Sequence, residues 1–190
     1  MIPTLYKTFQ RWSNGGAVWI ISDTHFDDYD MLASKDFNWL SPYSIVTKIN
    51  KYVQKQDTLI HLGDVGNPEY MQYVNGNFKI LIMGNHDKGK TEMRKYFNEV
   101  YSGALFIADK ILLSHEPISL PFCVNIHGHD HNQKESYKDD CQHINLACNV
   151  CNFTPLNLGK FIKNGGLACV KNIHRQTIDR AKNMKGGKYE

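Results

Sequence analysis

The chain has 190 residues, of which 42% are hydrophobic and 22% are charged, and its formal net charge is +3 at pH 7. This length and composition predict one globular domain with a substantial core rather than a disordered or fibrous protein. No apolar run approaches the roughly 20 residues of a membrane helix, and the N-terminus lacks a signal-peptide pattern. With an odd number of cysteines, five, these features lead us to expect a cytoplasmic protein that does not bind membranes.

The positive charge is concentrated near the C-terminus. Residues 160–190 carry eight Lys or Arg against two acidic side chains, a net charge of +6, while the other 159 residues have a net charge of −3. A basic segment can bind nucleic acid or an acidic partner, but this one ends in the Gly-rich sequence Lys185-Gly186-Gly187-Lys188. We therefore expect a domain over residues 1–170 and a basic, solvated tail over 171–190.

Short apolar runs bounded by turn residues predict strands, because they are too short for helices. Ser-Pro and Thr-Pro pairs predict helix starts, with the hydroxyl residue as cap and proline in the first turn. In chain order, we expect a strand at 17–22, a loop with a short helix at 26–40, a helix from Ser41-Pro42 to about 54, a strand at 58–62, a short helix at 68–74, a strand at 78–83, a helix capped by Thr91 to about 97, a hairpin of 105–108 and 111–114, strands at 122–127 and 144–150, and a helix from Thr154-Pro155 to about 162.

The alternation of strands and helices, followed by strands joined as hairpins, predicts an α/β fold. We expect an αββα sandwich, in which two mixed β-sheets pack face to face and helices flank them. Sites in such sheets form at the C-terminal ends of the strands. The sequence therefore predicts that side chains directly after the apolar runs form the functional site.

Metal-binding side chains follow these runs repeatedly. Asp23 and His25 are two residues apart, as are His129 and His131, so each pair projects to one side of an extended backbone. A mixture of carboxylate, amide and imidazole donors suits Mn, Fe or Zn better than Mg or Ca. The candidate stretches are Asp23-Thr24-His25, Gly63-Asp64, Gly84-Asn85-His86-Asp87, His115 and His127-Gly128-His129-Asp130-His131.

The order D-x-H, G-D, G-N-H-D, H and G-H-x-H resembles the calcineurin-like metallophosphoesterase superfamily, in particular its small single-domain members, over residues 17–132. The resemblance implies a dinuclear centre. It implies that one ion is held by Asp23, His25, Asp64 and His131, and the other by Asp64, Asn85, His115 and His129, with Asp64 bridging them. It also implies that His86 is the catalytic histidine and that Asp87 orients it.

One motif departs from the pattern of the small members. They often read D-T-H-F-G-H at the first motif, where this chain has Asp27 and Asp28 in place of the glycine and the second histidine. The candidate metal ligands are unaffected, whereas the side that faces the substrate is altered.

Two divalent ions bridged by a carboxylate can hold both the attacking and the leaving oxygen of an in-line displacement, with a metal-bound hydroxide as nucleophile. His86 is expected to protonate the leaving oxygen or to stabilise the equatorial phosphate oxygens. The sequence thus predicts a phosphatase or phosphodiesterase that uses two divalent ions, most simply Mn, Fe or Zn. Its substrate is a phosphate ester, with nucleotides and nucleic acid among the candidates, and the oligomeric state is left open.

Two other functions are compatible with the sequence. The same centre serves DNA and RNA nucleases, and the basic tail keeps that alternative open. Some members of the superfamily have lost ligands and act as metal-free interaction scaffolds, but every ligand position is filled here. The pair Cys148 and Cys151 forms a C-x-x-C motif without a second one. Because residues three apart in a strand face opposite sides, we expect these thiols to pack rather than to bind zinc.

Overall fold

The computed structural model describes residues 12, 16–35, 37–107, 110–120, 122–132 and 142–170. The predicted tail over 171–190 lies outside these residues, as do Ala108 and Asp109 in the predicted hairpin. The elements are β1 (Val18–Ile21), α2 (Tyr29–Leu32), α3 (Pro42–Asn50), β2 (Thr58–His61), the 3-10 helix η1 (Pro68–Gln72), β3 (Phe78–Ile82), α4 (Lys90–Met93), β4 (Glu99–Tyr101), β5 (Leu105–Ile107), β6 (Ile111–Leu113), β7 (Val124–His127), β8 (Gln142–Asn145), β9 (Leu156–Asn157) and α5 (Leu158–Lys163).

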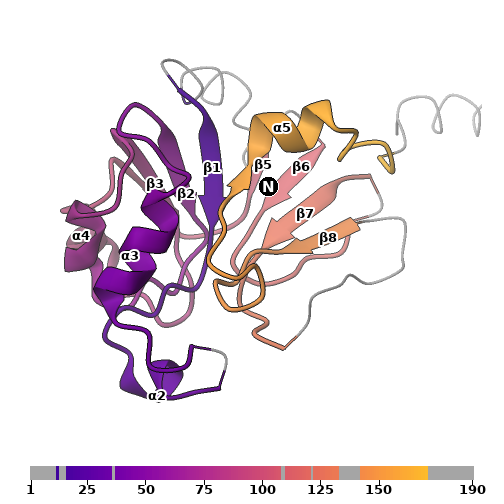
Figure 1. Ribbon diagram of the computed structural model, residues 1–190. Helices are drawn as coiled ribbons and strands as arrows, with labels where there is room; N and C mark the ends of the chain where they lie inside the picture. The colour runs from indigo at the N-terminus through magenta and orange to yellow at the C-terminus, as the bar shows by residue number, and fades with distance from the viewer. Residues whose placement is uncertain are drawn as a thin grey trace, which may run out of the picture.

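Two β-sheets form the body of the molecule (Figure 1). The first has the strand order β4-β3-β2-β1-β9 and the second has the order β5-β6-β7-β8. Each sheet is mixed, because β9 runs antiparallel to β1 and β5 runs antiparallel to β6, while the other neighbours are parallel. Helices α3 and α4 lie on the outer side of the first sheet, and α2 lies below its strand ends. The predicted α/β fold of two mixed sheets with flanking helices is confirmed.

The strands of the first sheet are buried on both faces. Ile20 and Ile60 pack in the core between the sheets together with Val124 of the second sheet. Their neighbours Ile21 and Leu59 pack in the core under the outer helices. Burial on both faces explains why these strands appear in the sequence as continuous apolar runs rather than as alternating patterns.

The parallel pairing determines where the residues that follow each strand lie. β1, β2 and β3 are parallel neighbours, so their C-terminal ends share one edge of the first sheet. β6 and β7 are parallel in the second sheet. The two edges meet, because Ser22 bridges to Ala147 and its backbone N–H donates to the carbonyl of Leu146 at 3.0 Å.

The start of α3 agrees with the sequence. The Oγ atom of Ser41 accepts a hydrogen bond from the backbone N–H of Ser44, and Pro42 is the first helical residue. The prediction for α4 was wrong in two respects. Gly89, not Thr91, is its N-cap, and the helix ends at Met93 rather than near 97. The chain must turn there to enter β4, a strand of three residues that is too short to show a periodicity in the sequence.

The C-terminal part of the described chain also differs from the prediction. β8 ends at Asn145 rather than at 150. The helix α5 begins at Leu158, where the Asn157 side chain accepts from the backbone N–H of Lys160, and not at Thr154-Pro155. The intervening strand β9 pairs with the edge of β1. A pairing between segments so distant in sequence leaves no local pattern, which is why this strand was missed.

Cys148 and Cys151 lie in a turn, so the expectation that they occupy a strand was wrong. Both thiols are free, and Cys148 is fully buried. Burial raises the pKa of Cys148 well above its usual value and raises that of Cys151 to about 11. Both therefore remain protonated near neutral pH, which agrees with packing rather than zinc or redox chemistry. In the described part of the chain, no helix has the length and apolar character needed to cross a membrane.

Candidate metal centre

The candidate ligands come from both sheets, directly after the strands. Asp23 and His25 follow β1, Asp64 follows β2 and Asn85 follows β3 in the first sheet. From the second sheet, His115 follows β6, and the His129 and His131 pair follows β7. Positive φ angles occur at four of these residues: Asp23 (56°), His25 (43°), Asp64 (54°) and His129 (67°). Side chains other than glycine rarely adopt this conformation, and residues held in it concentrate at functional sites.

These side chains form two groups. In group one, ligand atoms of Asp23, His25 and His131 all lie within 4.8 Å of one another, and in group two the same holds for Asp64, His115 and His129. Asn85 contacts group two, because its Oδ1 lies 2.9 Å from Nε2 of His115. Oδ2 of Asp64 lies 3.4 Å from Nε2 of His115 and 3.9 Å from Nε2 of His25, so it faces both groups.

Group one contains two buried polar atoms that have no hydrogen-bond partner among the described residues, namely Oδ1 of Asp23 and Nε2 of His25. Buried polar atoms are nearly always paired. The two atoms lie 3.9 Å apart, and Nε2 of His131 lies 3.6 Å from the same carboxylate oxygen. Ligands of one divalent ion stand roughly 3–4 Å apart, because each metal–ligand bond is about 2.0–2.2 Å long. The unpaired atoms and the donor types therefore fit a metal ion.

Electrostatics lead to the same conclusion. Burial raises the pKa of Asp23 because its carboxylate is removed from water. Burial also acts to raise the pKa of Asp64, but hydrogen bonds from His115 and from the backbone N–H of His86 hold it at about 2. The Asp64 carboxylate thus carries a buried negative charge, which a cation would stabilise.

Three candidate histidines are fixed by hydrogen bonds on the side away from the groups. In each of them Nδ1 faces an oxygen atom that can only accept, so Nδ1 carries the proton. In His25 and His131 this leaves the Nε2 lone pair facing the candidate centre, whereas Nε2 of His115 also faces an oxygen acceptor, Oδ1 of Asn85. The pairs are His25 with Asp28 at 3.0 Å, His115 with the carbonyl of Leu62 at 2.9 Å, and His131 with the side-chain oxygen of Asn149 at 2.9 Å. The sequence pattern singled out neither Asp28 nor Asn149 for this contact. Asp28 gave the weak signal of lying three residues after His25, and Asn149 gave none.

His86 is exposed beside the groups, with its ring centroid 6.0 Å from that of His25. Its neighbour Asp87 does not have the expected arrangement. The Asp87 carboxylate accepts backbone N–H groups of Gly84 at 2.8 Å, Asp64 at 3.1 Å and Val65 at 2.8 Å. Within the described chain, no hydrogen bond joins Asp87 to His86. Asp87 thus fastens the loop after β3 to the loop after β2.

His61 belongs to neither group, and it makes local hydrogen bonds. The backbone N–H of Gly63 donates to its Nδ1 at 3.2 Å, so Nε2–H faces Oγ1 of Thr24 at 3.1 Å. The Thr24 hydroxyl in turn donates to the carbonyl of Val65 at 3.0 Å. Burial lowers the pKa of His61 to about 3, so the ring stays neutral. It links the loop of Asp23 and His25 to the loop of Asp64.

The two acidic residues that replace the expected glycine and histidine face the protein. Asp27 has φ of 60°, a conformation that glycine adopts readily. Its carboxylate accepts from the side chains of Asn67 at 2.9 Å and Tyr70 at 3.2 Å. Asp28 contacts His25 and also caps α2. The two substitutions in this motif thus change the hydrogen bonds that support the loop after β1, which carries Asp23 and His25.

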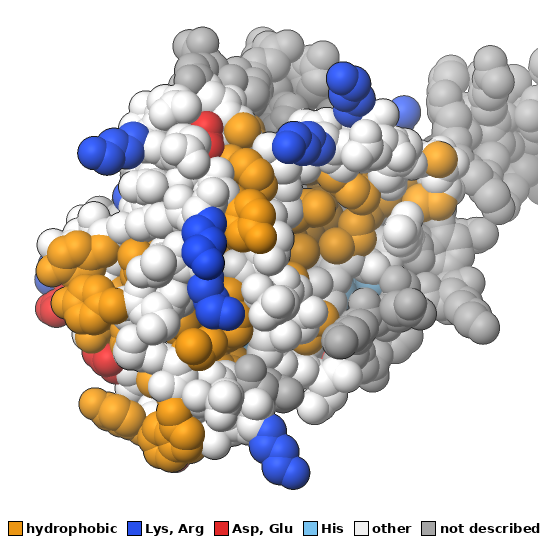
Figure 2. Space-filling model, viewed as in Figure 1, with side chains coloured by type: hydrophobic (Ala, Val, Ile, Leu, Met, Phe, Trp, Pro, Cys, Tyr) orange, Lys and Arg blue, Asp and Glu red, His pale blue; other side chains and the backbone are white. Residues whose placement is uncertain are grey.

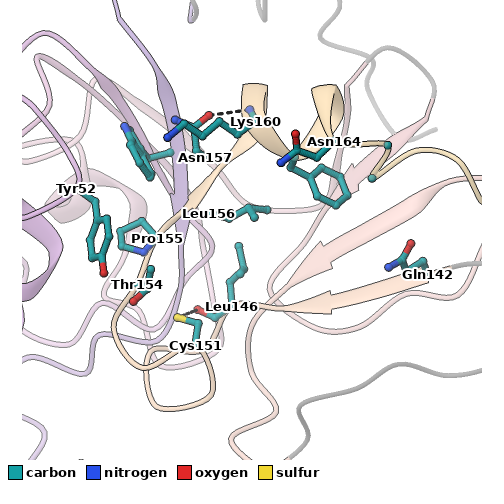
Figure 3. A pocket seen from close by; sticks show the side chains of 14 residues that line it. Tyr52, Gln142, Leu146, Cys151, Thr154, Pro155, Leu156, Asn157, Lys160 and Asn164 are labelled. Carbon is teal, nitrogen blue, oxygen red and sulfur yellow. Dashed lines mark hydrogen bonds between the residues drawn. The ribbon is translucent and has the colours of Figure 1, made fainter.

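A hollow of about 760 Å³ lies elsewhere, between β9, α5 and the ends of β1 and β8 (Figure 3). Its walls include Trp19, Tyr52, Leu156, Lys160 and Phe161, and hydrophobic side chains gather below α5 in Figure 2. No candidate ligand lines it. The donor groups at the strand ends, and not this hollow, therefore define the candidate site.

Comparisons with known proteins agree with the fold. The profile of the calcineurin-like phosphoesterase superfamily domain matches residues 17–149. Among solved structures, a protein of unknown function from Aquifex aeolicus is 30% identical, with a TM-score of 0.60, and the match covers 77% of this chain and 98% of that chain. An archaeal phosphodiesterase is 22% identical, with a TM-score of 0.43, over 67% of this chain and 81% of that chain. No curated protein sequence matches the chain.

The profile match covers well over half of the sequence and contains every candidate ligand and His86. The resemblance inferred from the motifs is therefore confirmed, and the chain belongs to the calcineurin-like phosphoesterase superfamily.

Proposed function

We propose that the protein hydrolyses a phosphomonoester or phosphodiester at a centre of two divalent metal ions. The observation that carries this proposal is the pair of donor groups at the strand ends, with the Asp64 carboxylate facing both of them. Membership of a superfamily of hydrolytic phosphoesterases supports the reaction type. The proposed ligands are Asp23, His25, Asp64 and His131 for one ion and Asp64, Asn85, His115 and His129 for the other.

The donor set favours Mn, Fe or Zn, because it mixes imidazole nitrogens with carboxylate and amide oxygens. When bound, the two ions would lower the pKa of a water molecule towards neutrality and offset charge on the phosphate oxygens. The chain's own residues fix the approach of the substrate. Asp23, His25, Asp64 and His115 are buried, whereas His86 and His129 are exposed. The phosphate group therefore enters from the side of the two exposed histidines.

His86 is the proposed proton donor for the leaving oxygen. Its backbone N–H donates to Oδ1 of Asp64 at 2.9 Å, which fixes the main chain beside the proposed bridging ligand. Its ring is exposed, and among the described residues no hydrogen bond joins it to a candidate ligand, so it is free to reach a substrate oxygen. This placement suits a group that acts on the substrate and does not hold an ion.

The test combines elemental analysis with a substrate screen. The protein is purified, its metal content is measured, and phosphomonoesters, phosphodiesters and cyclic nucleotides are assayed with added Mn²⁺. We expect two ions per chain in the native protein. Asp64→Asn should lose metal at both groups and abolish activity, since the proposed bridge is gone.

Asp57→Asn is the matched control, because Asp57 is also a buried carboxylate that accepts backbone and side-chain N–H groups. It lies at the opposite end of the sheet from the candidate ligands, at the start of β2. Its replacement should reduce stability without lowering the metal content of the folded protein. Two ions retained in Asp64→Asn would contradict the proposed centre.

The nuclease and scaffold alternatives predict other results. A scaffold would purify without stoichiometric metal and would hydrolyse none of the esters. The basic tail that suggested a nuclease lies outside the described residues, so it is tested by deletion of residues 171–190. Under the proposal, hydrolysis of a small chromogenic ester is unchanged in the deletion variant. Loss of nucleic-acid cleavage with ester hydrolysis retained would favour the nuclease.

A further inference from the structure

We propose that Asp28 and Asn149 are positioning residues that set the tautomer of His25 and His131 and thereby the metal affinity of group one. Neither residue is one of the candidate ligands. The inference rests on the proposed function, because the two histidines are proposed ligands. It adds that the histidines are oriented by different means, His25 and His131 of group one by side chains and His115 of group two by a backbone carbonyl.

Asp28 contacts His25 with one carboxylate oxygen and the start of a helix with the other. Its Oδ2 lies 3.0 Å from Nδ1 of His25, and its Oδ1 accepts from the backbone N–H of Met31 at 3.2 Å. The second bond makes Asp28 the N-cap of α2 and fixes where its carboxylate stands. A carboxylate offers a separate oxygen to each of these two donors.

Asn149 contacts His131 at two points. Its Oδ1 lies 2.9 Å from Nδ1 of the ring, and its Nδ2 donates to the backbone carbonyl of His131 at 2.7 Å. The second bond assigns the orientation of the amide, since only nitrogen can donate to a carbonyl. Asn149 lies two residues after Ala147, which bridges to Ser22 directly after β1. The segment that contains Asn149 therefore joins the ring of His131, from the second sheet, to the chain directly before Asp23.

These contacts decide which ring nitrogen can bind an ion. With Nδ1 protonated, the Nε2 lone pairs of His25 and His131 point towards Oδ1 of Asp23, at 3.9 Å and 3.6 Å. The opposite tautomer would direct an N–H bond at the same place and could not bind a cation. Asp28 and Asn149 thus select the tautomer that can bind.

Group two is oriented differently. Nδ1 of His115 lies 2.9 Å from the carbonyl of Leu62, a backbone atom that a side-chain substitution leaves in place. Substitutions at positions 28 and 149 should therefore weaken the binding of one ion and leave the affinity for the other unchanged. A general loss of stability would instead weaken both.

The experiment titrates the metal-free protein with Mn²⁺ and with Zn²⁺ by calorimetry. Asp28→Asn leaves one oxygen for two donors, and Asn149→Leu removes both contacts at similar size. We expect each to weaken one of two binding steps by roughly 10–100-fold, with the other step unchanged. Asn149→Asp keeps the oxygen that accepts from the ring, so it should restore part of the lost affinity. Asp30→Asn and Asn132→Asp are controls, because both residues are exposed and no bond between their side chains and a candidate ligand is seen in the described chain.

A second readout needs no metal. The ¹⁵N spectra of the histidine side chains in the metal-free protein should show His25 and His131 protonated at Nδ1, and the affected ring should lose this preference in Asp28→Asn or Asn149→Leu. If the native protein binds two ions and both folded variants keep both affinities and both tautomers, the inference is overturned while the proposed function stands. Equal weakening of both steps also overturns it. A native protein that binds no ion overturns the proposed function and the inference together.

Discussion

The backbone N–H of His129 donates a hydrogen bond to Oδ2 of Asp23 at 3.0 Å, across 106 positions of the sequence. Asp23 follows β1 of the first sheet and His129 follows β7 of the second, so this bond joins the two sheets at the candidate centre. It leaves Oδ1 of Asp23 to face His25 and His131 in group one. The same carboxylate thus orders the backbone of group two at His129 and offers its other oxygen to group one.

Gly128 makes this contact possible. A Cβ atom at position 128 would stand 2.0 Å from Oγ of Ser22 and 2.1 Å from Oδ2 of Asp23. We expect Gly128→Ala to push His129 away from Asp23, to destabilise the protein by about 1–3 kcal/mol or more, and to reduce its metal content. Gly103→Ala is the matched control, since nothing lies within 4 Å of its Cβ position. Thermal unfolding and elemental analysis measure both variants, and an unchanged melting temperature in Gly128→Ala would contradict the close approach.

His86 provides a test of general acid catalysis. His86→Ala should retain both ions, because the histidine is exposed and is not a proposed ligand. It should slow esters with poor leaving groups, such as alkyl esters, by roughly 10²–10⁴-fold. Nitrophenyl esters should slow far less, because nitrophenolate departs without a proton.

Steady-state rates for a series of esters with different leaving-group pKa values measure this effect. Equal slowing across the series would mean that His86 acts by electrostatic stabilisation instead. Loss of metal in His86→Ala would show that the ligand set is wrong.

Asp87 is expected to act on stability and not through His86. In Asp87→Asn, one of the two acceptor oxygens becomes an NH₂ group that faces a backbone N–H of Gly84, Asp64 or Val65. The cost of leaving a buried donor unpaired is about 1–3 kcal/mol. Urea unfolding of Asp87→Asn, His86→Ala and the double variant measures the coupling between them. If the two residues act separately, the changes in the free energy of unfolding add, whereas strong coupling would restore the view that Asp87 orients His86.

His61 should make stability depend on pH in a defined direction. Its pKa is lowered to about 3 in the folded protein and returns to the usual 6.5 on unfolding. As the pH falls from 6.5 towards 3, the unfolded chain therefore binds a proton that the folded chain does not. This reduces the free energy of unfolding by up to about 1.4 kcal/mol per pH unit.

In His61→Gln the unfolded chain cannot bind this proton, because glutamine does not titrate. The free energy of unfolding of the variant should therefore fall less steeply with falling pH than that of the native protein. Urea unfolding of the metal-free proteins at pH 7, 6 and 5 measures the two slopes, and His86→Gln serves as an exposed control. Parallel slopes for the native protein and His61→Gln would mean that the buried ring takes up a proton in the folded state.

The local sequence was sufficient for the fold class and for the positions of the candidate ligands. Apolar runs such as 17–22 and 58–62 predict buried strands on their own, and the polar residues after them must lie at the strand ends. Parallel pairing then brings Asp23 and Asp64 to one edge of the sheet. The order of the motifs added the family and the expected roles, and the profile match confirms the family.

Only the tertiary structure decided which side chains form hydrogen bonds that support the candidate metal centre. Asn149 meets His131, and Asp87 meets the backbone of Asp64 and Val65, through turns and strands that are distant in sequence. The strand β9 was missed for the same reason, because it exists only by pairing with β1. Periodicity and capping report the conformation of a segment, whereas a hydrogen bond between two loops depends on where separate strands place them, and no local pattern encodes that.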